Sequence, residues 1–149
     1  MTKSPPVTQS LRAWMEISMH RSMHERTLFA KSAGLSMPQF GILIQLHHKG
    51  RCGVSEIGEH FDITNAAASQ LVEKLVQAGY LERTEDTNDR RVKQLNLTAK
   101  GENLIENGAQ ERYRWLDELT SQLSAEERGK VTEALNILTK AAQIMEAKE

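Results

Sequence analysis

The sequence predicts a mainly α-helical fold with one small β-hairpin. Apolar residues recur at steps of three and four over most of the 149 residues, which is typical of amphipathic helices. Glycines fall singly between these periodic segments, as they do where helices end. Only over about 80–97 does the apolar period change to two, which indicates a pair of strands.

Composition predicts a single ordinary domain over 1–149. With 39% hydrophobic residues and a net charge of −1 the chain is too apolar for a disordered protein, and its mean hydropathy of −0.52 argues against a membrane span. Residues 1–10 lack the apolar segment of a secretory signal, so we expect a cytoplasmic location and no membrane partner. The lone cysteine, Cys52, excludes an internal disulfide and a cysteine zinc site.

Charge is distributed unevenly along the chain. Residues 1–100 contain 13 basic and 10 acidic residues, whereas residues 101–149 contain 6 and 10. We therefore expect the first two thirds to contact any polyanionic partner. A pI near 6.5 is too low for a non-specific nucleic-acid binder, so charge alone does not predict DNA binding.

Two helices are predicted before residue 50. The first spans about 8–29, ends before Gly34 and carries an apolar stripe on one side. The second begins at a capping box, Ser36 to Gln39, with Pro38 in its first turn, and stops at Gly50. The first stripe consists of Leu11, Trp14, Met15, Met19, Met23 and Leu28.

Two shorter helices, over 55–61 and 64–78, are separated only by Asp62 and Ile63, and this spacing predicts a helix-turn-helix. Gly79 closes the second of them. Its inward stripe is Ala68, Leu71, Val72 and Leu75, packed on Ile57, Phe61 and Ile63, which leaves Asn65, Ser69, Gln70 and Lys74 outside.

A hairpin and two long helices complete the predicted chain. Strands over 80–83 and 92–97 enclose a polar loop at 85–89. Thr98 is the predicted N-cap of a helix to about residue 122, and Ser124 to Glu127 form a second capping box. The last stripe is Val131, Leu135, Leu138, Ala142 and Met145.

The outward face of the second short helix suits a DNA major groove. Small and amide side chains approach base edges closely and exchange hydrogen bonds with them, and flanking polar side chains reach phosphates. An ordinary solvated helix face is the alternative explanation. The candidate residues are Thr64, Asn65, Ala66, Ser69, Gln70 and Lys74.

The adjoining hairpin favours the DNA-binding interpretation because it adds cations beside that helix. Its four basic residues are candidates for phosphate and minor-groove contacts. Four acidic residues balance them, so we expect a few placed arginines instead of a broad basic surface. The cations are Arg83, Arg90, Arg91 and Lys93, and the acids are Glu82, Glu85, Asp86 and Asp89.

Residues 89–101 read Asp-Arg-Arg-Val-Lys-Gln-Leu-Asn-Leu-Thr-Ala-Lys-Gly, which resembles a known wing signature, Asp-x-Arg followed by a strand and Leu-Thr-x-x-Gly. That signature is typical of the MarR (multiple antibiotic resistance regulator) family. Segments 35–43, 54–57 and 68–81 also fit the family's order and spacing. The resemblance covers about 8–147, although the terminal helices match by pattern only.

The resemblance implies a homodimeric winged helix-turn-helix transcriptional regulator. Helices within 8–34 and 102–147 would form the dimer, and 36–101 would form the DNA-binding lobe. Arg91 matches the wing arginine that enters the minor groove, Asp89 matches the aspartate that orients it, and Arg90 is a phosphate candidate. Gly58 stands where the family usually has alanine, which would loosen its helix by up to ~1 kcal/mol.

Dimerisation also follows from the apolar stripes of the terminal helices. Stripes containing Leu11, Trp14, Leu135 and Leu138 are more apolar than one small lobe can cover. A two-fold protein would read an inverted repeat with half-sites about one turn, ~10 bp, apart. We expect a repressor that covers a promoter and is released by an effector, with activation as an alternative.

A small-molecule effector is the only ligand that we expect, and the sequence shows no resident cofactor. The resemblance implies a small aromatic or amphipathic anion between the dimer region and the lobe, and Trp14, Met15, Met19 and Met23 are candidates for lining that crevice. Packing of these side chains in the core is the more frequent explanation of such a stripe.

Other functions have weaker support in the sequence. His20 and His24 have a spacing that suits one metal ion, but packed or exposed histidines are commoner, so zinc sensing is an alternative only. Cys52 lies in a turn and is not predicted to sense oxidants. There is no phosphate-binding loop or Gly-x-Ser-x-Gly motif, so we expect no enzyme. A winged-helix protein-protein adaptor is the remaining alternative.

Overall fold

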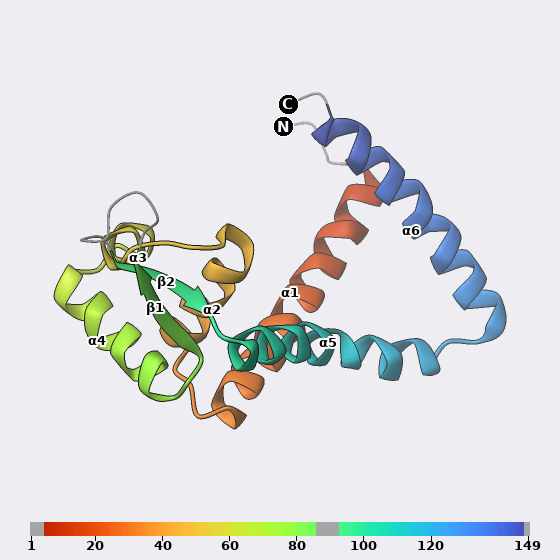
Figure 1. Cartoon of the computed structure of the whole chain (residues 1–149). Coiled ribbons are helices and arrows are strands. Elements are labelled where there is room, and N and C mark those ends of the chain that lie inside the picture. The colour runs from red at the N-terminus through yellow and green to blue at the C-terminus, as the bar shows by residue number, and fades with distance from the viewer. Residues whose placement is uncertain (1–4, 86–92, 148–149) are drawn as a thin grey trace. The chain divides into compact units, whose positions relative to one another are not determined.

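The computed structural model describes residues 5–85 and 93–147, and it divides into two compact units, 1–112 and 113–149. The predicted mainly helical fold with one antiparallel two-stranded sheet is confirmed (Figure 1). In chain order the elements are α1 (Pro6–Ser32), α2 (Met37–Lys49), α3 (Val54–Phe61), α4 (Asn65–Gln77), β1 (Leu81–Glu85), β2 (Lys93–Leu97), α5 (Ala99–Ser121) and α6 (Ala125–Glu146).

The predicted helix starts are confirmed by their capping hydrogen bonds. The Ser36 N–H donates to Gln39 Oε1 at 2.9 Å, and the Gln39 N–H donates back to Ser36 Oγ at 3.4 Å. Thr64 Oγ1 accepts from the Ala67 N–H at 3.2 Å. Ser124 caps α6 in the same way.

Two elements differ appreciably from their predicted bounds. The first helix, predicted over 8–29, starts at a favourable N-terminal proline, Pro6, and continues to Ser32. The first strand, predicted over 80–83, ends at Glu85, which was predicted to lie in the loop.

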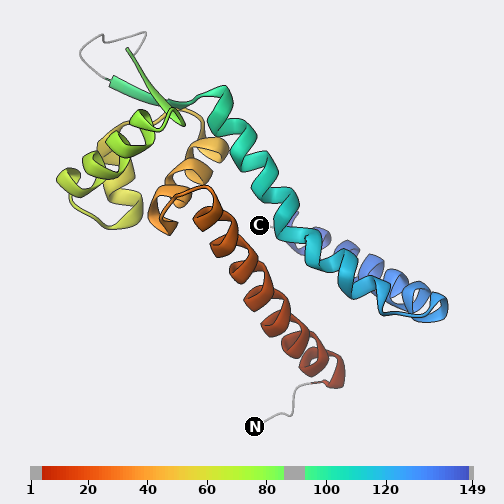
Figure 2. The same ribbon diagram turned by 90° about the horizontal axis from the view of Figure 1, so that it is seen from below.

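The core lies where α2, α3 and α4 meet the hairpin (Figure 2). The side chains of Ile42, Leu43, Ile57, Val72 and Leu75 are completely buried there. The predicted inward stripe of α4 is therefore confirmed, with Leu71, Phe61 and Ile63 partly buried against the same cluster.

A residue outside the hairpin pairs with one of its two strands, which the sequence did not predict. Leu81 pairs with Leu97 and Glu85 pairs with Lys93, which fixes the register of the two strands. Cys52, in the connection between α2 and α3, forms a bridge with Leu95 in which the Leu95 N–H donates to the Cys52 carbonyl at 2.9 Å. This bridge attaches the hairpin directly to the helical lobe.

A glycine at the start of α5 allows the hairpin to close against the end of α4. Thr98 Oγ1 donates to the Gly79 carbonyl at 2.6 Å and accepts from the Gly101 N–H at 3.1 Å, which confirms Thr98 as an N-cap. A Cβ at Gly101 would clash with the carbonyl oxygen of Tyr80 and with the Leu97 side chain. The backbones can approach this closely only at glycine.

Large apolar side chains are exposed on both terminal helices, each considered within its own unit. Trp14 on α1 is 38% exposed and Leu135 on α6 is 48% exposed, as the predicted stripes require, whereas Leu11 and Leu138 are half-buried. The expectation that Met15, Met19 and Met23 pack in the core is wrong for a single chain, because their exposed fractions are 54%, 61% and 52%.

None of the helices in the described part of the chain is long and apolar enough to cross a bilayer.

We expect Gly101→Ala to lower the free energy of unfolding by about 2–3 kcal/mol, because the Tyr80 backbone cannot move away from the new methyl group without disturbing the hairpin. Urea unfolding at fixed protein concentration measures this. Gly129→Ala is the matched control: Gly129 lies within α6 with open space around it, so alanine there should stabilise by about 0.5–1 kcal/mol. Equal effects of the two substitutions would contradict the close-approach argument.

Candidate nucleic-acid interface

The outward face of α4 presents all six candidate residues of the helix-turn-helix to solvent. Thr64 caps the helix, and it is exposed together with Asn65, Ala66, Ser69, Gln70 and Lys74. The opposite side of α4 is anchored by Ala68, Val72 and Leu75, each 0% exposed. The buried side therefore fixes which side chains α4 can offer to a partner.

The turn between α3 and α4 depends on one residue in the left-handed region and on one glycine at a close approach. Asp62 has φ 52° and ψ 48°, in the left-handed region, and the Ile63 N–H then donates to the Gly58 carbonyl at 2.9 Å. A Cβ on Gly58 would lie 3.0 Å from Asn65 Oδ1 and 3.1 Å from the Ile63 carbonyl oxygen. Glycine at 58 thus suits this turn, and α3 is continuous through it.

The connection between α2 and α3 is closed by Glu56. Its Oε1 accepts from the Gly53 N–H at 3.0 Å, while its Oε2 lies 2.6 Å from Lys49 Nζ. The lysine hydrogen bond and then the backbone N–H lower the pKa of Glu56, and the same pair raises the pKa of Lys49. This carboxylate therefore holds the start of α3 against the end of α2.

Two of the predicted hairpin cations are paired with acids. Arg83 Nη1 lies 2.9 Å from Glu73 Oε2, which joins β1 to α4, and Lys93 Nζ lies 3.1 Å from Glu85 Oε1 across the strands. Both pairs are about half exposed, so each is worth at most about 1 kcal/mol. Arg83 therefore positions the hairpin against α4 in addition to any contact with phosphate.

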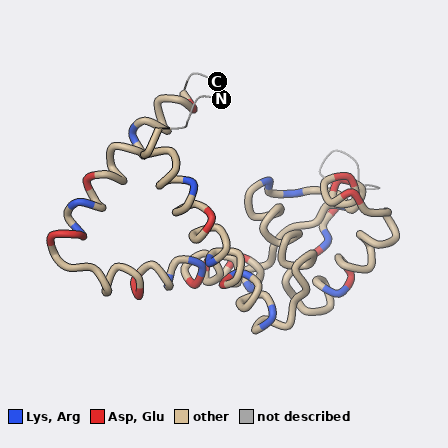
Figure 3. The backbone as a smooth tube through the Cα atoms, turned by 180° about the vertical axis from the view of Figure 1, so that it is seen from behind, with Lys and Arg blue, Asp and Glu red and all other residues tan. Residues whose placement is uncertain are grey.

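Asp89, Arg90 and Arg91 lie outside the described residues, and their predicted roles remain predictions. The strands that carry their loop end in the register pair of Glu85 and Lys93. Basic and acidic positions are interleaved along the described chain instead of forming one block of a single sign (Figure 3).

The alternative sensing residues lie apart from this face. His20 and His24 are exposed on α1, and within 5–85 and 93–147 no group of three His, Cys, Asp or Glu side chains is arranged to hold a metal ion. Cys52 is 0% exposed, and burial, followed by the charge of Glu56, raises the pKa of its thiol. A buried thiol with a raised pKa is a poor nucleophile.

Comparison with known proteins identifies the family. A model of the MarR family matches residues 35–93. The HTH-type transcriptional regulator BilQ from Clostridium symbiosum is 31% identical over 121 residues, which cover 78% of this chain and 84% of BilQ. MhqR from Bacillus subtilis, also an HTH-type transcriptional regulator, is 32% identical over 124 residues, covering 83% of this chain and 82% of MhqR. The chain belongs to the MarR family.

Solved structures agree with this assignment. The transcriptional regulator Tm0710 from Thermotoga maritima matches this MarR-family chain with a TM-score of 0.83 and 27% identity, over 95% of this chain and 99% of its own. A MepR variant from S. aureus, solved bound to an oligodeoxyribonucleotide, matches in fold with a TM-score of 0.71, at 21% identity, over 89% and 97% of the two chains. MarR-family proteins are DNA-binding transcriptional regulators and not enzymes, as the sequence predicted.

Sequence reasoning missed polar links between elements of this MarR-family protein. They include the ion pair between Lys49 and Glu56, the ion pair between Glu73 and Arg83, and the contact of His47 Nδ1 with Glu102 Oε2 at 2.8 Å, which joins α2 to α5. The partners in each link lie on different elements. Hydrophobic periodicity predicts the apolar faces only, so no signal in the sequence pairs these residues.

We expect native Cys52 to react with DTNB at least about a hundredfold more slowly than the same thiol in 8 M urea at about the same pH, because the reagent must wait for an opening of the fold. Absorbance at the thionitrobenzoate band follows the reaction. Similar rates in buffer and in urea would show that the thiol is accessible and would reopen the oxidant-sensing hypothesis.

Proposed function

We propose that this protein is a homodimeric repressor that binds an inverted repeat in double-stranded DNA and is released by a small-molecule ligand. The observation that carries the proposal is the outward face of α4, where small and amide side chains are exposed on a helix whose other side is completely buried. Such a face can enter the major groove without steric hindrance.

The contacts are assigned by side-chain chemistry. The amides of Asn65 and Gln70 and the hydroxyl of Ser69 exchange hydrogen bonds with base edges, and Ala66 allows close approach. Phosphates are contacted by Thr64 at the helix N-terminus, by Lys74 and by Arg90. Arg91 enters the minor groove with Asp89 orienting it. The fold shared with the DNA-bound MepR variant supports this arrangement.

A second copy of the chain is the proposed cover for the exposed apolar side chains. On α6 the exposed set includes Ile137 at 63% and Ile144 at 51%, and on α1 it includes Met19 at 61%. Contact of this much apolar surface with water is unfavourable. A two-fold interface would bury the apolar surface of both copies. Two lobes related in this way would bind half-sites ~10 bp apart.

Repression would follow from occupancy of a promoter in the cytoplasm, where the DNA lies. The ligand is a small aromatic or amphipathic molecule. It favours a distance between the two lobes at which they cannot contact both half-sites at once. Trp14, Met15, Met19 and Met23 remain candidates for its apolar contacts, since all four are exposed on α1.

Two substitutions test the assigned contacts. Arg91→Ala should weaken binding to every duplex and lower the slope of log affinity against log salt by about one unit per subunit contact. Gln70→Ala should change the bases preferred at one position of each half-site, by about 1–3 kcal/mol. Fluorescence anisotropy with random-sequence duplexes and with duplexes selected from a random library measures both effects.

Arg128→Ala is the matched control, because Arg128 lies at the start of α6 and is exposed. It should leave both the salt slope and the base preference unchanged. If the Arg91 and Gln70 variants bind selected and random duplexes as the parent does, the assigned roles are wrong. If the parent binds no duplex, the adaptor alternative is favoured.

A further inference from the structure

The first turn of α5 holds the backbone that follows α4. Three consecutive carbonyl oxygens accept hydrogen bonds there. The Ala78 carbonyl accepts from Lys100 Nζ at 2.7 Å. The Gly79 carbonyl accepts from Thr98 Oγ1 at 2.6 Å, and the Tyr80 carbonyl accepts from the Thr98 N–H at 3.1 Å. The C-terminal end of α4 is therefore joined to α5 at three successive positions of the chain.

The last turn of α4 is closed by backbone N–H groups that follow it. The Leu75 carbonyl accepts from the Tyr80 N–H, and the Val76 carbonyl accepts from the Gly79 N–H, both at 2.9 Å. Gly79 has φ 78°, in the left-handed region that commonly ends a helix. The helix thus supplies the closing bonds of its own last turn, and α5 supplies the donors for the next three carbonyls.

Lys100 is the donor in this set that carries a charge. Its ammonium group lies at the C-terminal end of α4, where the helix dipole concentrates partial negative charge. The same ammonium group lies 4.4 Å from the centroid of the Tyr80 ring, within cation–π distance. A Cβ at Gly79 would lie 3.9 Å from Lys100 Cδ, so the stem of the side chain also passes close to the turn. Three neighbours therefore fix an exposed lysine.

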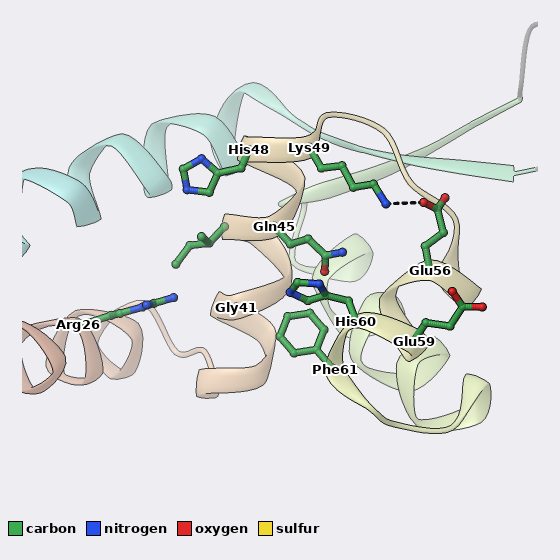
Figure 4. A pocket seen from close by; sticks show the side chains of 10 residues that line it. Arg26, Gly41, Gln45, His48, Lys49, Glu56, Glu59, His60 and Phe61 are labelled. Atoms are coloured by element: carbon green, nitrogen blue, oxygen red, sulfur yellow. Dashed lines mark hydrogen bonds and ion pairs between the residues drawn. The ribbon is translucent and has the colours of Figure 1, made fainter. Parts of the chain in front are cut away.

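Lys49 shows how differently a lysine can join two elements of the same lobe. Lys49 Nζ lies 2.6 Å from Glu56 Oε2, so a carboxylate neutralises it where α2 meets α3 (Figure 4). Within 5–85 and 93–147, no ion pair of this kind involves Lys100. Its charge is directed at a main-chain carbonyl and an aromatic ring. A hydrogen bond from a charged donor is stronger than one from a neutral donor, which favours Lys100 as a determinant of where α4 ends.

The placement of α4 at both ends decides how accurately it can meet a groove. Thr64 caps the first turn, and burial of Val72 and Leu75 fixes which side faces outward. Hydrogen bonds to base edges require the donor and acceptor to stay within about 0.5 Å of the productive geometry. A shift of the C-terminal end would tilt the helix and move its outward side chains by different amounts. Base recognition therefore depends on the contacts at that end.

We propose that Lys100 is a positioning residue for DNA recognition. Its ammonium group holds the C-terminal end of α4 against the first turn of α5 and so keeps α4 in the orientation that reads bases. The inference rests on the proposed function only in that α4 is the reading helix. The link between α4 and α5 is itself measured without DNA.

Two other roles for Lys100 give different outcomes when its charge is removed. A lysine that contacts a phosphate directly would lower the slope of log affinity against log salt by about one unit. An ordinary surface lysine would change neither affinity nor specificity. A positioning residue lowers the preference for a selected duplex over a random one and leaves the salt slope unchanged, because base contacts need accurate placement and phosphate contacts carry no sequence information.

Three variants of the full chain separate these roles. Lys100→Met removes the ammonium group but keeps an unbranched apolar stem. Lys100→Arg keeps a positive charge and a donor, so it serves as the rescue variant. Lys31→Met is the matched control, because Lys31 is an exposed lysine in the last turn of another helix, α1. It makes the same change in net charge away from the contact between α4 and α5.

Fluorescence anisotropy with selected and random duplexes at several salt concentrations measures the effect on DNA binding. Lys100→Met should lower the ratio of selected to random affinity by about three- to tenfold, as expected for loss of one contact at a helix end and one cation–π contact. Its salt slope should equal that of the parent. Lys100→Arg should recover most of the ratio, and Lys31→Met should leave the ratio unchanged.

Hydrogen–deuterium exchange without DNA measures the link itself. Peptides that contain residues 75–80 should exchange at least about threefold faster in Lys100→Met than in the parent, because the last turn of α4 opens more often. Peptides from α2 should exchange at the same rate in both proteins. Lys100→Arg should return the exchange of residues 75–80 close to the rate of the parent.

Unchanged exchange at residues 75–80 in Lys100→Met overturns the proposal. It is also overturned if Lys100→Met lowers the salt slope by about one unit, if Lys100→Arg recovers nothing, or if Lys31→Met causes the same loss of specificity. A parent protein that binds no duplex rejects the proposed function. Faster exchange in Lys100→Met would then retain the link between α4 and α5, so the two failures are distinguishable.

Discussion

Burial of one side of α4 is the constraint on which the rest of the structure depends. Ala68, Val72 and Leu75 are 0% exposed, and burying a Val or Leu side chain contributes roughly 1.5–3 kcal/mol. A rotation of α4 by one residue would bring Ser69 into the core and leave its hydroxyl without water. The hydrophobic effect therefore selects the polar face that a partner meets, and the same packing fixes the direction of the turn at Asp62.

The position of the hairpin relative to α4 follows from close backbone contacts more than from charge. Thr98 joins the start of α5 to the Gly79 carbonyl, and Gly101 lets the helix pass the Tyr80 backbone. The Glu73 and Arg83 ion pair adds a weaker link on the solvent side. These contacts hold the hairpin and α4 together as one unit.

The sequence predicted the fold and the exposed face of α4 because both depend on apolar periodicity and on caps such as Ser36 and Thr64. It did not predict the bridge between Cys52 and Leu95, which joins segments far apart in the chain. The contact between His47 and Glu102 could not be predicted either, because it joins α2 to α5 across 55 positions of the chain. The sequence also did not show that Met19 is exposed in a single chain. Apolar periodicity identifies a helix face that packs against something, but it does not say whether the partner is the same chain or another one.

The most direct test of the account is protection of α4 by DNA. Because Cys52 is buried, a thiol introduced on the surface is the one that an alkylating reagent modifies. Ser69→Cys places this thiol on α4, and Asn107→Cys places it on the exposed side of α5 as a control. Each variant is alkylated with and without a saturating duplex. If α4 lies in the major groove, the duplex slows alkylation at position 69 by at least about tenfold and leaves the rate at position 107 unchanged. Equal rates at position 69 in free protein and in the complex would show that α4 does not face the DNA.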